Sequence, residues 1–271
     1  INKIINRCFI FVKAASSIFN FSLLKSQFLK SIASLILFKI MIISPIIFNE
    51  STVLFHFSAV VESFPYILEG TFVTLRYTLL SIFFGFMIGS LLALMKLSSC
   101  KILEIFSKFY TSIFRGTPLL VQLSLIYFAL PQLTGYRITA FEAGVLAFSL
   151  NSGAYISEII RAGIQAVDKG QFEAAAALGV TRRFIMKDII FPQAIKNILP
   201  ALVNEFVNLL KESALISIIG EADLLRRANI IAAEKYIYFE PLVAVGFIYY
   251  VLVMLFSKLA TVLEKRLTKS D

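Results

Sequence analysis

The sequence predicts an all-α membrane protein that crosses the bilayer several times, with five core transmembrane helices and one further helix near the amino terminus. Three observations lead to this prediction. Apolar residues make up 58% of the chain and charged residues 16%, whereas a soluble domain has about 45–50% and about 25%. The apolar residues gather in stretches of about 20, the length that a helix needs to cross a bilayer. The basic residues gather between these stretches.

Six apolar stretches are predicted to be membrane helices. The five core spans are residues 71–95, 119–133, 138–160, 198–219 and 241–262. The sixth stretch, residues 28–48, carries Lys39 near its middle, which costs about 2.5–3.5 kcal/mol at a helix centre; a cleaved signal peptide is its alternative. The chain is therefore divided into residues 1–60, a basic segment with the extra helix, and residues 61–271, the transmembrane domain.

The distribution of basic residues predicts the orientation, because Lys and Arg collect on the cytoplasmic side. Residues 96–115 carry four basic residues against the single acidic Glu104. This loop is predicted to be cytoplasmic, as are the basic segments 161–196 and 258–269. The intervening loops then lie outside. The amino-terminal end is basic before any acidic residue occurs, so both termini are predicted to be cytoplasmic and the sixth helix restores the alternation.

Several classes of function are excluded by composition. The net charge of +9 is explained by loops that face anionic lipid, so no nucleic-acid partner is predicted. Cys8, Cys100 and the single histidine, His56, are too scattered to form a metal site. None of the 12 glycines is followed by Lys, so the chain lacks a P-loop and does not hydrolyse ATP unaided. No cofactor is predicted on this chain.

The most informative segment is the inner loop 170–192, which reads GQFEAAAALGVTRRFIMKDIIFP. Residues 173–178 favour a helix, Gly179 favours a turn, and residues 182–190 resume an amphipathic pattern that we expect Pro192 to stop. Two short helices at an angle are predicted. A loop this long and this regular in pattern indicates a docking element for a cytosolic partner. A helix lying on the lipid surface is the alternative.

This inner loop resembles a known family. Its residues Glu173-Ala174-Ala175, Gly179, Ile189 and Pro192 are similar to the EAA motif of permease subunits of bacterial ATP-binding-cassette importers. The resemblance implies the type I importer permease fold, a location in the bacterial inner membrane, and a coupling loop, residues 168–192, that binds the ATPase subunit. Glu173 would make a charged contact with that subunit, Ala174 and Ala175 would permit close approach, and Gly179 would supply the turn. The implied coupling residues are Gly170, Glu173, Ala174, Ala175, Gly179 and Pro192.

Further motifs resemble the polar amino acid importers, of the histidine, glutamine and arginine type. Residues 115–122, RGTPLLVQ, are similar to their signature before the second core helix, and residues 153–171 are similar to the run into their coupling loop. Residues 211–215, KESAL, depart from the family's usual Asp, Thr or Ser, Ser order, which affects the cargo assignment rather than the transporter class. The resemblance implies uptake by alternating access. It also implies three partners: a cytosolic subunit that binds ATP and Mg, a periplasmic solute-binding protein, and a second copy or a related permease.

Polar residues inside the predicted spans indicate a path for a hydrophilic solute, independently of the family. At about 100° per residue they fall on one face of each of two helices. These faces consist of Asn204, Glu205, Asn208, Lys211 and Glu212 in one span, and of Asn151, Tyr155 and Glu158 in the span before it. Ionisable groups at this depth usually line a cavity. Bonding between helices, worth about 0.6–2 kcal/mol per residue, is an equally open alternative.

Two other functions remain open at this point. A secondary transporter or channel driven by an ion gradient would use Glu205, Lys211 and Glu212 as an ion relay, although no internal repeat is visible. A membrane scaffold that transports nothing would not be expected to carry polar faces. Gly85 and Gly89 form a GxxxG pair, which favours close helix packing over a role in transport.

Overall fold

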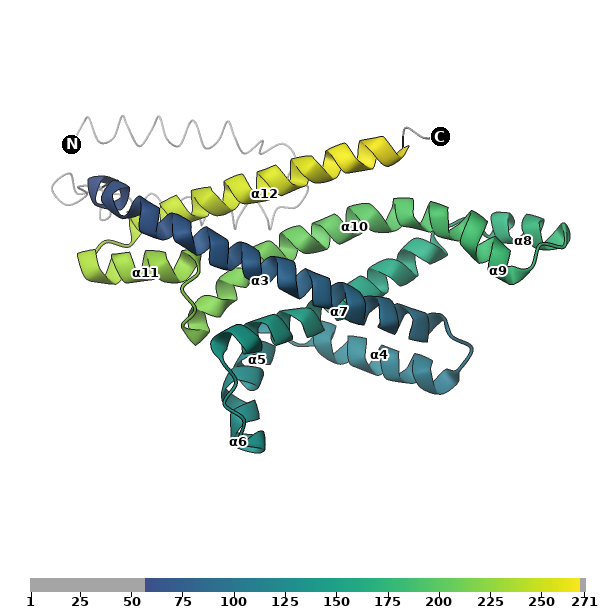
Figure 1. Cartoon of the computed structure of the whole chain (residues 1–271), viewed down its shortest axis with the longest axis horizontal. Coiled ribbons are helices and arrows are strands. Elements are labelled where there is room, and N and C mark those ends of the chain that lie inside the picture. The colour runs from purple at the N-terminus through teal and green to yellow at the C-terminus, as the bar shows by residue number, and fades with distance from the viewer. Residues whose placement is uncertain (1–56, 269–271) are drawn as a thin grey trace, which may run out of the picture. The chain divides into compact units, whose positions relative to one another are not determined.

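The computed structural model describes residues 57–268 of the chain, and Figure 1 shows them as a set of connected helices. No β-strand occurs in this range, which confirms the predicted all-α class. The elements are α3 (Phe57–Leu97), α4 (Lys101–Gly116), α5 (Leu119–Ser124), η2 (Leu125–Ala129), α6 (Leu130–Thr134), α7 (Ala140–Gln165), α8 (Lys169–Ala177), α9 (Arg182–Phe184), η3 (Ile185–Ile190), α10 (Phe191–Glu212), η4 (Ser213–Ile219), α11 (Leu224–Lys235) and α12 (Phe239–Thr268). The helix predicted at residues 28–48 lies outside the described residues.

Within residues 57–268, three helices are long and apolar enough to cross a membrane by themselves. They are Val60–Leu97 in α3, Ala140–Gln165 in α7 and Phe239–Val262 in α12, and they contain the predicted spans 71–95, 138–160 (apart from its first two residues) and 241–262. The predicted span 198–219 begins in α10 and ends in the 3-10 segment η4. Its polar residues explain why α10, although 22 residues long, is not apolar enough to join the other three.

The segment 96–115, which was predicted to be a loop, is mostly helix. Residues 101–116 form α4, which turns back beside α3 after a short connection, where Ser107 Oγ donates to the Leu92 carbonyl at 2.8 Å. The prediction was wrong because it counted charges; the apolar residues Ile105, Phe109 and Ile113 lie on an exposed face of α4 with helical spacing. Helix α4 and residues 119–134 meet at a bend of 100° and count as a span only when taken together.

Helices α3 and α7 pack side by side and run in the same direction (Figure 1). As the residue number rises on α3, the number of its partner rises on α7: a Cβ at Gly85 would meet Ser152, and one at Gly89 would meet Ile156. Gly153 on α7 faces Ile88 in the same seam. The small residues therefore let the two backbones approach closely, and the helix-packing interpretation of the GxxxG pair is confirmed.

Replacing Gly89 by Val is expected to destabilise the folded protein by about 1–3 kcal/mol, because the added side chain overlaps Ile156 in a seam that is already full. Thermal unfolding in detergent measures the effect. The matched control is Gly246→Val on α12, where an added Cβ would meet no atom within 4 Å. Equal losses in the two variants would contradict close packing at the seam.

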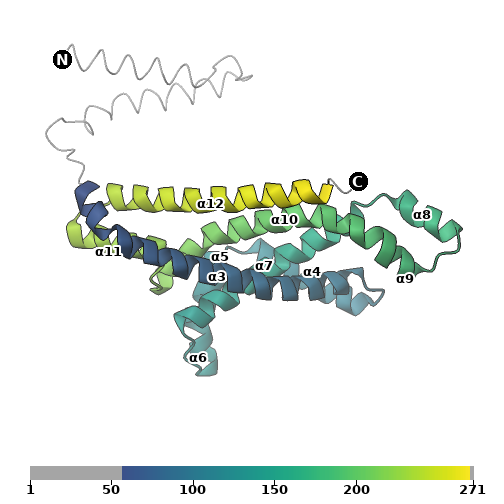
Figure 2. The same cartoon turned by 45° about the horizontal axis from the view of Figure 1, so that its top comes forward.

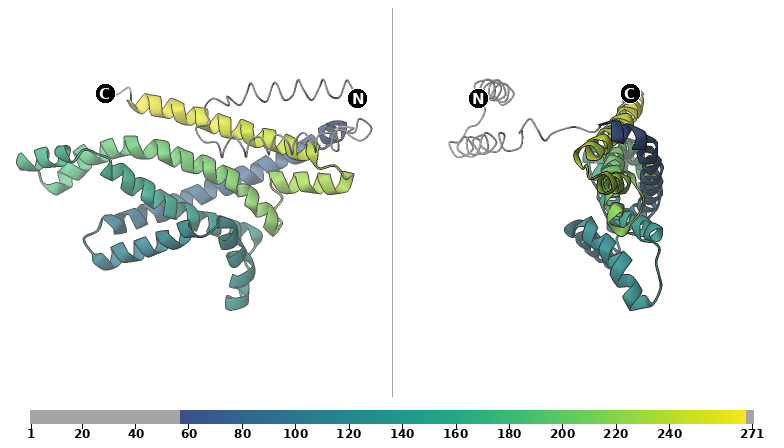
Figure 3. Two further views of the ribbon diagram at one scale, coloured as in Figure 1. Left: turned by 180° about the vertical axis from the view of Figure 1, so that it is seen from behind. Right: turned by 90° about the vertical axis from the view of Figure 1, so that its left-hand side faces the viewer.

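The remaining helices complete the bundle around this pair. Helix α10 runs back along α7: Asn197 Nδ2 donates to the Gly163 carbonyl at 3.4 Å, and Leu209 joins a core with Phe148. Helix α12 packs on α10, where the rings of Phe206 and Phe256 lie 4.8 Å apart. Figure 2 shows α8 and α9 together at one end of the bundle. Figure 3, seen from behind, shows α6 projecting from the long helices.

Candidate functional site

The segment predicted to be a coupling loop folds as two short helices joined by a sharp turn. The Asp168 side chain accepts a hydrogen bond from the Gly170 amide at 2.8 Å and so caps α8. Helix α8 ends in a Schellman motif, in which the amides of Gly179 and Val180 donate to the carbonyls of Ala176 and Ala175. Gly179 has φ +79°, a conformation that favours glycine. The predicted turn at Gly179 is confirmed.

The predicted stop at Pro192 is wrong. Arg182–Phe184 begin a helix that passes through the π-helical segment η3 into α10, and Pro192 lies in the first turn of α10. Inside a continuous helix a proline lacks the N–H for a backbone hydrogen bond, and its ring crowds the preceding turn. The wider π turn just before it accommodates the ring without breaking the chain direction. The second short helix is therefore rigidly continuous with a long one.

The coupling loop has a small core of its own. Ala175 of α8 is buried against Val167, Ile185 and Ile190, so this alanine serves the packing of the loop itself. Glu173 and Ala174 are exposed on the same helix. Beyond them Leu178 is 83% exposed and Phe184 is 55% exposed. The loop thus exposes the Glu173 carboxylate and apolar side chains at the end of the molecule that Figure 2 shows.

The polar face predicted on α10 is present and open. Asn204, Asn208 and Lys211 are exposed and Glu205 is half-buried, while Leu210 on the opposite side is buried. At the end of this face lies an open hollow of about 360 Å³. Its lining consists of Asn208, Lys211, Glu212, Ala214 and Leu215. The hollow offers an ammonium, a carboxylate and an amide within one concavity.

Asn151, which was predicted to share a face with Tyr155 and Glu158, is buried inside the bundle. Its Nδ2 donates to the Phe114 carbonyl and to Gln122 Oε1, both at 3.0 Å. Gln122 Nε2 in turn donates to Thr117 Oγ1 at 2.8 Å. These contacts surround the bend between α4 and α5, where Pro118 interrupts the helix and leaves carbonyls without helical partners. The described structure therefore uses the Asn151 side chain to hold the bend.

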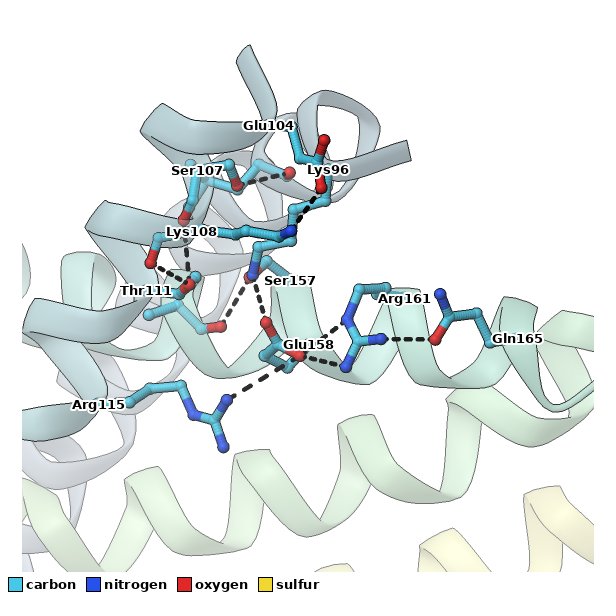
Figure 4. Close-up of polar contacts among 12 residues, drawn as sticks. Lys96, Glu104, Ser107, Lys108, Thr111, Arg115, Ser157, Glu158, Arg161 and Gln165 are labelled. Atoms are coloured by element: carbon cyan, nitrogen blue, oxygen red, sulfur yellow. Dashed lines mark hydrogen bonds and ion pairs between the residues drawn. The ribbon is translucent and has the colours of Figure 1, made fainter. Parts of the chain in front are cut away.

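Glu158 is the centre of a charged cluster on the following turns of α7, which Figure 4 shows in close-up. Lys96 Nζ, at the end of α3, lies 2.5 Å from Glu158 Oε1 and 2.9 Å from Ser157 Oγ. Arg161 contacts Glu158 Oε2 through two nitrogens at 2.9 and 2.7 Å. Arg115, at the end of α4, lies 4.0 Å from the same oxygen. Three cations from three helices thus share one carboxylate.

Exposure distinguishes the members of this cluster. The Lys96 side chain is 2% exposed and that of Glu158 is 23% exposed, so the ammonium is buried and its carboxylate partner is partly exposed. The Arg115 side chain is 45% exposed, and its guanidinium lies over the Tyr155 ring, 5.3 Å from the ring centre. A buried ammonium depends on its carboxylate partner, because an unpaired charge away from water is costly. The more exposed Arg115 guanidinium does not depend on Glu158 in this way.

The chain matches the family model of the binding-protein-dependent transport system inner membrane component over residues 81–269. It belongs to this family. The matched range includes the coupling loop, the polar face of α10 and the Glu158 cluster. The predicted membership of the ATP-binding-cassette importer permeases is confirmed.

Relatives of this permease cover most of its length. It is 58% identical to the putative glutamine transport system permease protein GlnP of Rickettsia bellii, over 76% of this chain and 94% of that protein. It is 50% identical to the arginine transport system permease protein ArtQ of Bacillus subtilis, over 79% of this chain and 98% of that protein.

Solved structures agree with the fold of the permease. A crystal structure of an amino acid ABC transporter with histidines superposes with a TM-score of 0.76 at 50% identity, covering 79% of this chain and 100% of that one. An inward-facing structure of the MetNI methionine ABC transporter superposes with a TM-score of 0.62 at 21% identity, covering 74% and 96%. The second likeness concerns the fold alone. The predicted type I importer fold is confirmed.

Several residues of the permease site were missed by the sequence reasoning. Leu178 and Phe184 were part of the coupling loop's sequence but were not selected, since their exposure depends on how α8 and η3 pack. Lys96 was counted only as an indicator of orientation, and Arg115 was given no role beyond that and its place in the motif 115–122. Gln122 carried a signal, because it is a polar side chain inside a predicted span, where polar groups need partners.

Proposed function

We propose that this permease moves a polar amino acid inward across the bacterial inner membrane, using ATP that a separate subunit hydrolyses. The observation that carries the proposal is the coupling loop. It has its own core, it exposes Glu173 and Leu178, and it is joined directly to α7 and α10. A compact loop of this kind moves as a body. A partner that binds the coupling loop can therefore move both α7 and α10.

The partner in this proposal is a cytosolic ATP-binding subunit, which holds ATP and Mg. Glu173 makes a charged contact on that subunit, and Leu178 and Phe184 supply the apolar centre of the interface, as expected for a docking surface whose rim is polar. Gly179 keeps the turn at the tip tight. Gly170 and Ala174 leave space for close approach along α8.

The cargo path in this proposal follows the exposed face of α10. Asn204, Glu205, Asn208 and Lys211 offer donors and acceptors of both charges, which suits the ammonium and carboxylate of a zwitterionic amino acid. Relatives named for glutamine and arginine, and a structure with histidines, support this cargo class. A second copy, or a related permease, encloses the path from the other side.

The transport cycle is alternating access. ATP binding brings the two coupling loops together and opens the path outward, where a periplasmic solute-binding protein delivers the cargo. Hydrolysis then returns the path to the inward-open state. Both termini and the coupling loop lie in the cytoplasm in this scheme, in agreement with the basic residues of loop 161–196.

Reconstitution tests the proposal. The permease is co-expressed with the ATP-binding and solute-binding proteins of its own source, incorporated into proteoliposomes and supplied with a labelled amino acid. Uptake is expected only with ATP inside and binding protein outside. Uptake that continues after ATP depletion and is abolished by an ionophore would instead identify a secondary transporter, and would contradict the proposal.

Replacing Asn208 by Leu is expected to lower uptake about tenfold, because the cargo loses a hydrogen-bond partner worth about 1–1.5 kcal/mol at a site from which water is displaced. Co-purification of the ATP-binding subunit should not change. Asn229→Leu on α11, away from the polar face, is the matched control. Unchanged uptake in the Asn208 variant would assign that residue to helix packing.

A further inference from the structure

One face of α7 holds the end of α4 at three successive levels. Asn151, Tyr155 and Glu158 are spaced by four and three residues, so they lie along one side of the helix. Asn151 donates to the Phe114 carbonyl, the Tyr155 ring lies under the Arg115 guanidinium, and Glu158 lies 4.0 Å from Arg115 Nη1. We refer to these three α7 residues with their α4 contacts as the α7 clamp.

The α7 clamp closes on the bend between α4 and α5. Phe114 and Arg115 occupy the last turn of α4, and Pro118 follows directly. A helix end beside proline has carbonyls that no amide of its own can satisfy. Asn151 and Gln122 together supply those donors, and Glu158 attracts the adjacent cation. The position of the bend is therefore set from α7.

The segment beyond the bend is anchored where it begins and is less buried further on. Leu119, Gln122 and Leu123 of α5 are buried, and Ile126 and Tyr127 of η2 pack against the same core. No residue of α6 is buried in the described structure, and Figure 3 shows α6 projecting from the long helices. A movement of the bend therefore reaches α6 through α5 and η2.

The same helix that carries the α7 clamp runs into the coupling loop. Helix α7 ends at Gln165, Asp168 caps α8, and Arg161 links Glu158 to Gln165 through two side-chain contacts. Figure 4 shows this series running along α7 from Arg115 to Gln165. A continuous helix transmits rotation and translation along its length with little loss.

We propose that the α7 clamp is a transmission element, in which Arg115, Asn151 and Glu158 are positioning residues that make the α4–α5 bend move with the coupling loop. They act through the bend and not by contact with the cargo. This inference rests on the proposed function, since it requires a partner that moves the loop.

Arg115→Gln is the variant of choice, because it opens the α7 clamp and leaves the Lys96–Glu158 pair and the Arg161 contact in place. In proteoliposomes with the complete transporter, the ATPase rate should stay within about twofold of the parent, while cargo moved per ATP hydrolysed falls roughly tenfold. The apparent KM for cargo-loaded binding protein should not change. Arg115→Lys, which keeps the charge, should restore part of the coupling.

Lys108→Gln is the matched control, since it removes an exposed cation two turns earlier on the same helix. The inference would be overturned if the Arg115→Gln variant moved as much cargo per ATP hydrolysed as the parent protein does. It would also be overturned if the variant had a raised KM and an unchanged maximal rate, which would make Arg115 a cargo contact. Neither result would contradict ATP-driven uptake by the parent protein. Uptake by the parent that needs no ATP would overturn the proposed function as well.

Discussion

Replacing Glu158 by Gln is expected to destabilise the folded permease by about 2–3 kcal/mol, less than the range of about 3–5 kcal/mol for a fully buried ion pair, because the Glu158 side chain is 23% exposed. The reason lies in Lys96, whose side chain is only 2% exposed and is neutralised by Glu158 at 2.5 Å. Without the carboxylate the ammonium stays buried among neutral partners, the Ser157 hydroxyl and the new amide oxygen, and no negative charge compensates it. Thermal unfolding in detergent should show a midpoint lower by roughly 10 °C.

Two companion variants make this result interpretable. Glu104→Gln breaks the exposed Glu104–Lys108 pair of α4 and should cost at most about 0.5 kcal/mol, because water replaces an exposed partner. Lys96→Met in the Glu158→Gln background removes the buried charge and should recover a large part of the loss. A double variant no more stable than Glu158→Gln alone would show that Lys96 is not the source of the effect.

Replacing Glu173 by Lys is expected to leave the permease in the membrane but to weaken binding of the ATP-binding subunit on the order of 100-fold, as happens when a charge is reversed within a complementary interface. Uptake should fall to background in consequence. Glu173 is exposed, so the substitution leaves the packing of the coupling loop unchanged. The amount of ATP-binding subunit that co-purifies with the permease is the direct measurement.

The same charge reversal on the opposite side of the bundle is the control. Glu234 is an exposed carboxylate of α11, and Glu234→Lys should retain the ATP-binding subunit fully. If Glu173→Lys also retains it and shows normal ATP hydrolysis stimulated by the substrate, Glu173 has no role in docking. The surface carried by Leu178 and Phe184 would then have to account for binding alone.

Composition and periodicity were enough to predict the parts of the fold that depend on the membrane. The spans in α3, α7 and α12 are uniform apolar stretches, so their existence follows from the length and hydropathy of each. The turn at Gly179 was also predictable, because a left-handed residue at the end of a helix favours glycine. Each of these features depends only on residues that are close together in the sequence.

Features that depend on contacts between distant segments were not predictable in this way. Helical periodicity placed Asn151, Tyr155 and Glu158 on one face of α7, but it could not say what that face meets. It meets the end of α4, a helix that the count of basic residues had assigned to a loop. The cargo path predicted on α7 therefore stays a prediction without structural support, and the path on α10 stays a prediction whose polar side chains are exposed.

Pro192 illustrates a different limit. As a local signal, proline after an amphipathic run indicates a helix end. In the structure the π-helical turn of η3 precedes it and the helix continues into α10. A π turn leaves no clear mark in a single sequence, so the rigid connection between the coupling loop and α10 became visible only in three dimensions.

The parallel packing of α3 and α7 also fixes the topology of the chain between them. Two spans that enter the membrane from the same side require one return crossing, and residues 98–139 must provide it. Helix α4 and the segment 119–134 therefore share a single net crossing, with the 100° bend inside it. If this region straightened into two separate crossings, α7 would be inverted and the coupling loop would emerge on the opposite side of the membrane from the connection between α3 and α4.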